Sequence, residues 1–195
     1  IQKIHCKMMN LPWDDRKAQF SAQEMFQRLW DFKWCPPGRG LWAMDLELLN
    51  LKGSACLFNC SFISTTNINI DFAEPFCFMM DFSMLGVGVG ADTKGAGKVK
   101  IVRPQPTGTS FIVEDSREVW VDLLKMVLNS FVGKNPLPYC HMDDGKLALN
   151  VDFSQVRPRG ALIRGFGGVS SGPEPLIDCI GTIVQLLIKP FENNP

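Results

Sequence analysis

Apolar residues recur every three or four positions in several stretches of the chain, which is the spacing of an α-helix. The most regular stretch begins at Asp115 or Ser116 and runs to about Val132, with its apolar residues on one face. Ser21 followed by Glu24 is a capping-box pattern and predicts a helix start there. Helices are therefore predicted over residues 14–32, 71–85, 116–132 and 176–189, with a short helix or turn over 46–51.

Strands are predicted where β-branched and aromatic residues gather between turn residues. These stretches are 56–65, 99–102, 111–113 and 147–153. Residues 134–146 are predicted as a polar loop, 86–90 as a tight turn and 165–172 as a Gly/Ser-rich loop. Because helices alternate with strands, the pattern predicts an α/β fold.

Charge and hydropathy exclude some functions. The 195 residues include 20 Lys plus Arg and 20 Asp plus Glu, so the formal net charge is zero and no nucleic-acid partner is expected. No apolar run approaches the ~20 residues of a membrane-spanning helix, so no membrane span is expected. The chain opens at Ile1 without a signal-peptide pattern, and we expect either a processed start or a piece of something longer.

The seven cysteines are irregularly spaced, and an odd number is a poor basis for a disulfide framework. The simplest interpretation is mostly buried thiols in the cytoplasm or another reducing compartment. With two histidines and no Cys-x-x-Cys pattern, no metal site is expected.

Three segments carry residue types that suit ligand chemistry. Residues 34–42 combine prolines, glycines and Arg39, which fit either a rigid turn or a loop rich in hydrogen-bond donors. The glycines at 86, 88 and 90 would let backbone amides approach a ligand, but a tightly packed turn explains them equally well. Residues 165–173 precede a predicted helix and suit an anion cradle, with an ordinary loop and helix cap as the alternative.

Several phrases stand along the chain in a fixed order. They are Cys-Pro-Pro-Gly-Arg-Gly-Leu-Trp-Ala-Met at 35–44, Asn59-Cys60, the segment 82–90, Glu-Asp-Ser-Arg-Glu at 114–118, Arg-Pro-Arg-Gly at 157–160 and the stretch 165–173. In this order they resemble the monomeric class II, adenosylcobalamin-dependent ribonucleoside-triphosphate reductases. The resemblance runs from about Trp34 to the C-terminal region.

The resemblance implies a ten-stranded α/β barrel, of which this chain would hold the first half only. Residues 1–33 would be an N-terminal helical segment, and 34–195 the first part of the barrel. The resemblance also implies adenosylcobalamin as cofactor, ribonucleoside triphosphates as substrates and a thioredoxin-like reductant as partner. Few strands are predicted here, so the remainder of the barrel or a partner protein is expected to complete the fold.

The same resemblance assigns a redox role to Cys60, which directly follows Asn59. It implies that Cys60 is one of two cysteines that deliver electrons to the substrate and end as a disulfide. The alternative is a buried strand thiol that only packs. The residues implied for substrate binding are Asn59, Ser61, Gly88, Gly90, Ser170, Ser171 and Gly172.

Two departures from the family pattern lead to a second hypothesis. The phrase Asn-Pro-Cys-Gly-Glu, which carries the family's radical cysteine, does not occur, since Asn-Pro at 135–136 is followed by Leu137. Asp45 and Glu47 stand where the family commonly has Gly-Thr, and their charges would repel a triphosphate. The second hypothesis is a catalytically inactive, reductase-derived fragment that acts as a structural or interaction subunit in a larger assembly.

Overall fold

The computed structural model describes residues 2–43, 46–143, 146–163 and 168–192. Met44, Asp45 and the first three residues of the glycine-rich phrase that begins at residue 165 therefore lie outside the described residues. The chain divides into two compact units, Ile1–Asn59 (unit 1) and Cys60–Pro195 (unit 2).

Unit 1 is built from short helices. They are α1 (Gln2–Met8), α2 (Asp15–Trp30), α3 (Gly38–Ala43), α4 (Glu47–Lys52) and the 3-10 helix η1 (Ser54–Leu57). Asp14 caps α2, because its carboxylate accepts hydrogen bonds from the amides of Arg16 (3.0 Å) and Lys17 (3.1 Å). The helix predicted over 14–32 is confirmed, but the helix start predicted at Ser21 is wrong because Asp14 already caps the first turn.

The strand predicted over 56–65 is only partly present in the structure. Gly53 ends α4 with a φ of 72°, and its amide donates to the Leu49 carbonyl oxygen at 3.1 Å. The helix η1 then occupies residues that were predicted to begin a strand. The strand predicted over 56–65 is thus shorter, because its first residues continue in a helical turn after the α4 cap.

Unit 2 contains both strands and helices. They are β1 (Cys60–Ile63), α5 (Glu74–Met84), β2 (Gly88–Ala91), β3 (Pro106–Thr107), β4 (Phe111–Ile112), α6 (Arg117–Ser130), β5 (Leu137–Asp143), β6 (Lys146–Leu149), β7 (Val151–Asp152) and α7 (Glu174–Glu192). Among these, β1 pairs with β2 in parallel, β4 pairs with β7 in parallel, and β5 lies between β3 (parallel) and β6 (antiparallel). The α/β class is confirmed.

Three local predictions in unit 2 are wrong. The segment predicted as a polar loop over 134–146 contains β5, which is stabilised by pairing with β3 and β6. No strand forms over 99–102, where Val99 and Ile101 instead pack against the core. The tight turn predicted over 86–90 is limited to its start, because the last glycines of that segment lie in β2.

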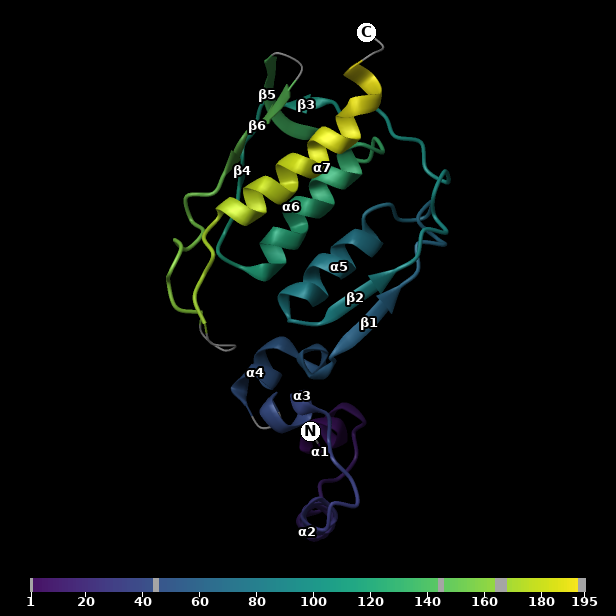
Figure 1. Cartoon of the computed structure of the whole chain (residues 1–195), viewed down its shortest axis with the longest axis vertical. Helices are drawn as coiled ribbons and strands as arrows, with labels where there is room; N and C mark the ends of the chain where they lie inside the picture. Colours follow the sequence, from purple (N-terminus) through teal and green to yellow (C-terminus); the bar gives the residue numbers. More distant parts are fainter. Residues whose placement is uncertain (1, 44–45, 144–145, 164–167, 193–195) are drawn as a thin grey trace. The chain divides into compact units, whose positions relative to one another are not determined.

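The core of unit 2 lies between its helices and the short sheets. Helix α6 packs against both α5 and α7, and the three helices lie side by side in Figure 1. Ser116 caps α6, since its hydroxyl accepts a hydrogen bond from the Val119 amide at 3.2 Å. The buried residues of α6 and α7 recur at helical spacing and include Leu123, Leu124, Val127, Leu128, Ile180, Val184 and Ile188. This confirms the amphipathic helix predicted for 116–132 and the helix predicted for 176–189.

Candidate active site

Cys60 opens β1 and lies opposite Gly88, which opens β2. Helix α5 connects the two parallel strands and contacts both, so the three elements form a β-α-β unit. The Cys60 side chain is exposed and its thiol is free. This thiol therefore lies open on the surface of the described unit, beside a residue without a side chain.

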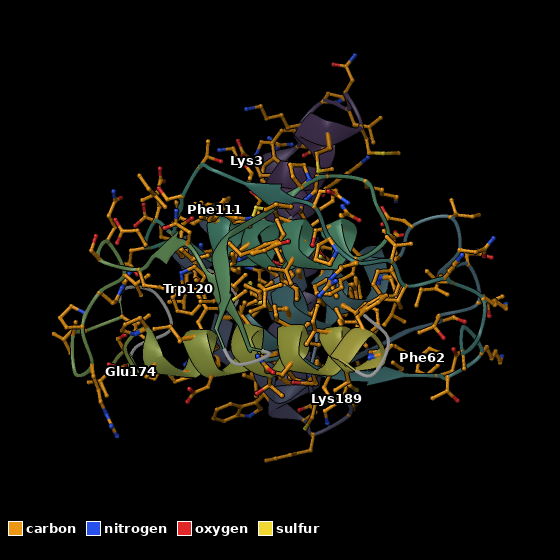
Figure 2. The ribbon with its side chains drawn as sticks, turned by 90° about the horizontal axis from the view of Figure 1, so that it is seen from above. Lys3, Phe62, Phe111, Trp120, Glu174 and Lys189 are labelled. Carbon is orange, nitrogen blue, oxygen red and sulfur yellow. The ribbon has the colours of Figure 1, made fainter. Side chains whose placement is uncertain are left out.

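Glycines leave the face beside the Cys60 thiol open. Side chains alternate along a strand, so Cys60 and Phe62 lie on one face, with Gly88 and Gly90 as their partners in register. A Cβ at Gly90 would lie 3.3 Å from Cδ2 of Phe62, so the ring lies close to this position. Figure 2 shows Phe62 at the periphery of the ribbon, and its side chain is exposed. A thiol, an aromatic ring and a bare glycine backbone thus share one accessible face.

Ser61 and Asn59 are adjacent to Cys60 in the chain but differ in their surroundings. By strand alternation the Ser61 side chain lies on the face opposite Cys60. Its hydroxyl oxygen is buried and has no hydrogen-bond partner among the described residues. Asn59 is exposed immediately before β1. The strand therefore brings together Cys60, Gly88 and Gly90 on one face and holds Ser61 behind it.

Ser170, Ser171 and Gly172 lie in a separate segment that precedes α7. Ser170 is buried, its amide donates to the Ala161 carbonyl oxygen at 2.7 Å, and its hydroxyl accepts from the Gly172 amide at 3.0 Å. Gly172 has a φ of 81°, which a side chain rarely tolerates. Ser171 alone of the three is exposed. The Ser170 hydroxyl thus serves the local turn, and Ser171 is open to solvent.

This serine segment and the Cys60 face lie apart in unit 2. In Figure 1 the chain that enters α7 lies on the left of α5 and α6, and the β1–β2 pair lies on the right. Arg157 holds the serine segment near the start of α6, because its Nε donates to the Asp115 carboxylate at 2.6 Å and its Nη1 to the Leu162 carbonyl oxygen at 3.3 Å. The structure therefore brings together only the predicted site residues on β1 and β2.

Asp92, which directly follows β2, was not singled out by the sequence. Its carboxylate accepts hydrogen bonds from the Ser64 hydroxyl (2.7 Å), the Thr65 amide (2.9 Å) and the Thr65 hydroxyl (2.8 Å). The hydrogen bond from Ser64, followed by that from the Thr65 amide, holds the pKa of Asp92 well below its usual range. No local motif marks this residue, because Ser64 and Thr65, which donate to it, lie far from it in the chain.

The described residues contain no cluster of three or more His, Cys, Asp or Glu side chains that could hold a metal ion. No described helix is both long and apolar enough to span a membrane.

Two family models match the chain. The model of the insertion domain of B12-dependent ribonucleotide reductases matches residues 89–187, about half of the chain. The chain belongs to the B12-dependent ribonucleotide reductase family. The ribonucleotide reductase alpha-domain model also matches residues 1–46, which extends the similarity upstream of Trp34.

Similar proteins include reductases of two eukaryotes. The adenosylcobalamin-dependent ribonucleoside-triphosphate reductase of Euglena gracilis is 40% identical over 191 residues, which is 96% of this chain and 24% of that reductase. A probable reductase of the same kind from Dictyostelium discoideum is 39% identical over 207 residues, or 97% of this chain and 26% of that protein. The chain thus spans about a quarter of the length of these reductases.

A crystal structure of a B12-dependent (class II) ribonucleotide reductase has a similar fold. The TM-score is 0.68 at 22% sequence identity, over 94% of this chain and 32% of that one. This likeness shows that the mixed α/β arrangement of the chain is a ribonucleotide reductase fold.

Proposed function

We propose that this chain is part of an adenosylcobalamin-dependent ribonucleoside-triphosphate reductase, and that Cys60 is one of the two thiols that reduce the substrate. The observation that carries the proposal is the exposed Cys60 thiol, held opposite Gly88 on paired parallel strands. Relatives support the proposal, because reductases of this name are similar to almost the whole chain. Because the chain spans about a quarter of these relatives, the activity is proposed for a protein that also contains the parts of a reductase outside this chain.

The proposed chemistry uses a pair of thiols. Cys60 and a second thiol, from outside the described residues, each give one proton and one electron. The ribose C2′–O bond breaks and the hydroxyl leaves as water with one proton, a C2′–H bond forms with the other, and the two sulfur atoms join as a disulfide, so the ribonucleotide is reduced as the thiol pair is oxidised. A thioredoxin-like dithiol then reduces the disulfide by thiol–disulfide exchange and restores Cys60.

The cofactor contacts are assigned to other parts of the protein. Adenosylcobalamin, when bound, supplies the radical that starts the reaction. No described residue is proposed here as a contact for its corrin ring or its cobalt. The role proposed for this chain is to hold a reducing thiol against the substrate.

Substrate contacts are proposed at two places, one around Cys60 and one in the segment that precedes α7. The open backbone at Gly88 and Gly90 suits the approach of the ribose to Cys60, with Asn59 next to it in the chain, whereas the Ser61 side chain lies on the opposite face of the strand. Ser170, Ser171 and Gly172, which lie apart from the Cys60 face, are proposed as a second place of nucleotide contact, where the exposed Ser171 is best placed to donate.

The larger architecture is proposed by resemblance. In it, residues 1–33 form an N-terminal helical segment and 34–195 contribute the first half of a ten-stranded α/β barrel. The remainder of the barrel or a partner protein would cover the open β1–β2 edges. The free cysteines of the described residues suit the cytoplasm or another reducing compartment.

A second candidate function is a catalytically inactive, reductase-derived subunit with a structural or interaction role. It is favoured by the apolar surface of unit 1, where α2 buries none of its residues and exposes Phe20, Phe26 and Trp30. Such a surface suits contact with another protein, whether or not Cys60 reacts.

Turnover by the full-length protein distinguishes the two functions. The protein is incubated with adenosylcobalamin, a ribonucleoside triphosphate and a dithiol, and deoxynucleotide is quantified by chromatography. Cys60→Ser is expected to lower kcat by about a hundredfold or more, because the substituted hydroxyl cannot form the disulfide. Cys179→Ser is the matched control, since Cys179 is also exposed but lies on α7. The kcat of the Cys179→Ser variant is expected to equal that of the native protein. Native turnover retained in Cys60→Ser overturns the redox role, and no product from the native protein favours the inactive subunit.

A further inference from the structure

Asp92 links the ends of the two strands that carry the candidate site. Its carboxylate directly follows β2, and the groups that donate to it belong to Ser64 and Thr65, which directly follow β1. Ile63 and Ala91 are the last residues of the β1–β2 register. The Asp92 hydrogen bonds therefore continue the pairing of the two strands beyond their last backbone partners.

The loop after β2 adds contacts at the same place. The buried Thr65 hydroxyl accepts a hydrogen bond from the Gly95 amide at 2.8 Å. A Cβ at Gly95 would lie 2.5 Å from the Thr65 carbonyl oxygen, so only glycine allows this approach. Lys98 Nζ donates to the Thr66 carbonyl oxygen at 2.7 Å. The segment after β1 is thus held by the carboxylate and by the loop that follows it.

The β1–β2 pair needs such a link to keep its register. Each strand has four residues, and within the described part of the chain the two strands pair only with each other. Gly88 and Gly90 supply no side chains for cross-strand contacts, which normally stabilise a register. A slip by one residue would give Cys60 a new partner and turn side chains to the other face.

We propose that Asp92 is a positioning residue, which holds the Cys60 thiol opposite Gly88 and so sets the rate at which Cys60 reduces the substrate. The inference rests on the proposed function of Cys60. Asp92 does not contact the substrate in this proposal, because its carboxylate is occupied by Ser64, Thr65 and the Lys94 amide. It acts through the register of β1 and β2.

Hydrogen exchange tests the link without any assay of activity. In Asp92→Ala, the amides of β1 and β2 are expected to exchange at least about tenfold faster than in the native protein, because the strand ends separate more often. Asp152→Ala is the matched control. Asp152 also ends a strand, but its carboxylate accepts a hydrogen bond from the nearby Ser154 amide at 2.8 Å. Unchanged exchange in β1 and β2 of Asp92→Ala overturns the proposal.

Steady-state kinetics of the full-length reductase test the consequence for catalysis. Asp92→Ala is expected to lower kcat by about tenfold or more with little change in KM for the nucleotide, since the thiol is displaced while the substrate contacts remain. Asp92→Asn is expected to restore kcat to within about threefold, because an amide oxygen still accepts from Thr65. Asp92→Glu keeps the charge but moves the carboxylate outward, and its kcat is expected to stay low.

The outcomes separate the two proposals. If Cys60→Ser keeps native turnover, the proposed function fails, and the exchange experiment still reports whether Asp92 holds the strands. If Cys60→Ser abolishes turnover but Asp92→Ala keeps native kcat, the positioning role alone is overturned. Should Asp92→Ala fail to fold, judged by circular dichroism, the comparison of Asp92→Asn with Asp92→Glu decides, and equal kcat in these two variants overturns the proposal.

Discussion

At the scale of single residues, burial separates the described thiols of unit 2. Cys60 and Cys179 are exposed, whereas Cys77 on α5 is partly buried, and its Sγ lies 3.9 Å from the Val121 carbonyl oxygen. Burial raises the pKa of Cys77 to about 11, so this residue keeps its proton at neutral pH. Because the thiolate is the reactive form, Cys77 is suited to packing, and the accessible Cys60 is the better candidate for chemistry.

Alkylation tests the raised pKa of Cys77. At pH 8 its thiolate fraction is about 10⁻³, so labelling by iodoacetamide is expected to be slow and to rise about tenfold per pH unit toward pH 11. The effect on stability runs the other way, because labelling rises with pH while stability falls. Above pH 9 the unfolded state loses the Cys77 proton and the folded state keeps it, so the free energy of unfolding falls as pH rises from 9 to about 11. Mass spectrometry of each labelled peptide measures the rates, with the exposed Cys179 as control. Labelling of Cys77 as fast as Cys179 at pH 8 contradicts the prediction.

At the scale of elements, the helices of unit 2 depend on local signals and the strands on distant partners. Helix α6 has a serine cap before it and an apolar face that meets α5 and α7. The strands β1 and β2 are short and rely on their pairing and on Asp92. A change at a helix cap should therefore cost stability without moving the candidate site.

Ser116→Ala tests the cap of α6. The variant loses the hydroxyl that accepts from the Val119 amide, and its free energy of unfolding is expected to fall by about 1 kcal/mol. Urea denaturation followed by circular dichroism measures the change. Ser83→Ala, an exposed position within α5, is the control and is expected to stay within about 0.5 kcal/mol of the native protein. Equal midpoints for the two variants would show that the cap adds nothing.

At the scale of the whole molecule, the two units differ in how well they are packed. Unit 2 has a continuous core between its helices and short sheets. In unit 1, α2 buries none of its residues and exposes Phe26 and Trp30, whose rings stack with their centroids 6.1 Å apart. A helix without buried residues has little tertiary packing to oppose its local opening.

Limited proteolysis tests this difference. Trypsin is expected to cut after Arg28 in α2 about tenfold sooner than after Lys125 in α6, because cleavage follows local unfolding. Both side chains are exposed on helices, so Lys125 is a matched control for access to the basic residue. The first fragments are identified by mass spectrometry. Cleavage after Lys125 at the same rate as after Arg28 contradicts the prediction.

Much of the helical structure was predictable before the fold was known, and Cys60 was also identified from the sequence as a candidate site residue. The start of α6 follows from Ser116 and the apolar repeat after it, which are both local signals. Cys60 was found through the phrase Asn59-Cys60 within an ordered set of motifs. Strand β5 was missed because its mixed polar residues show no period, and pairing with β3 and β6 decides its conformation.

The sequence by itself determined the α/β class, the cap and apolar face of α6, the presence of α7, and the family to which the chain belongs. Only the tertiary structure decided that Cys60 lies opposite Gly88, that the serine segment lies apart from it, and that Asp92 ties β1 to β2. The physical reason is the separation along the chain between the residues that interact. Helix signals act between residues three or four positions apart, whereas the Asp92 hydrogen bonds join residues 27 and 28 positions apart, which no local pattern records.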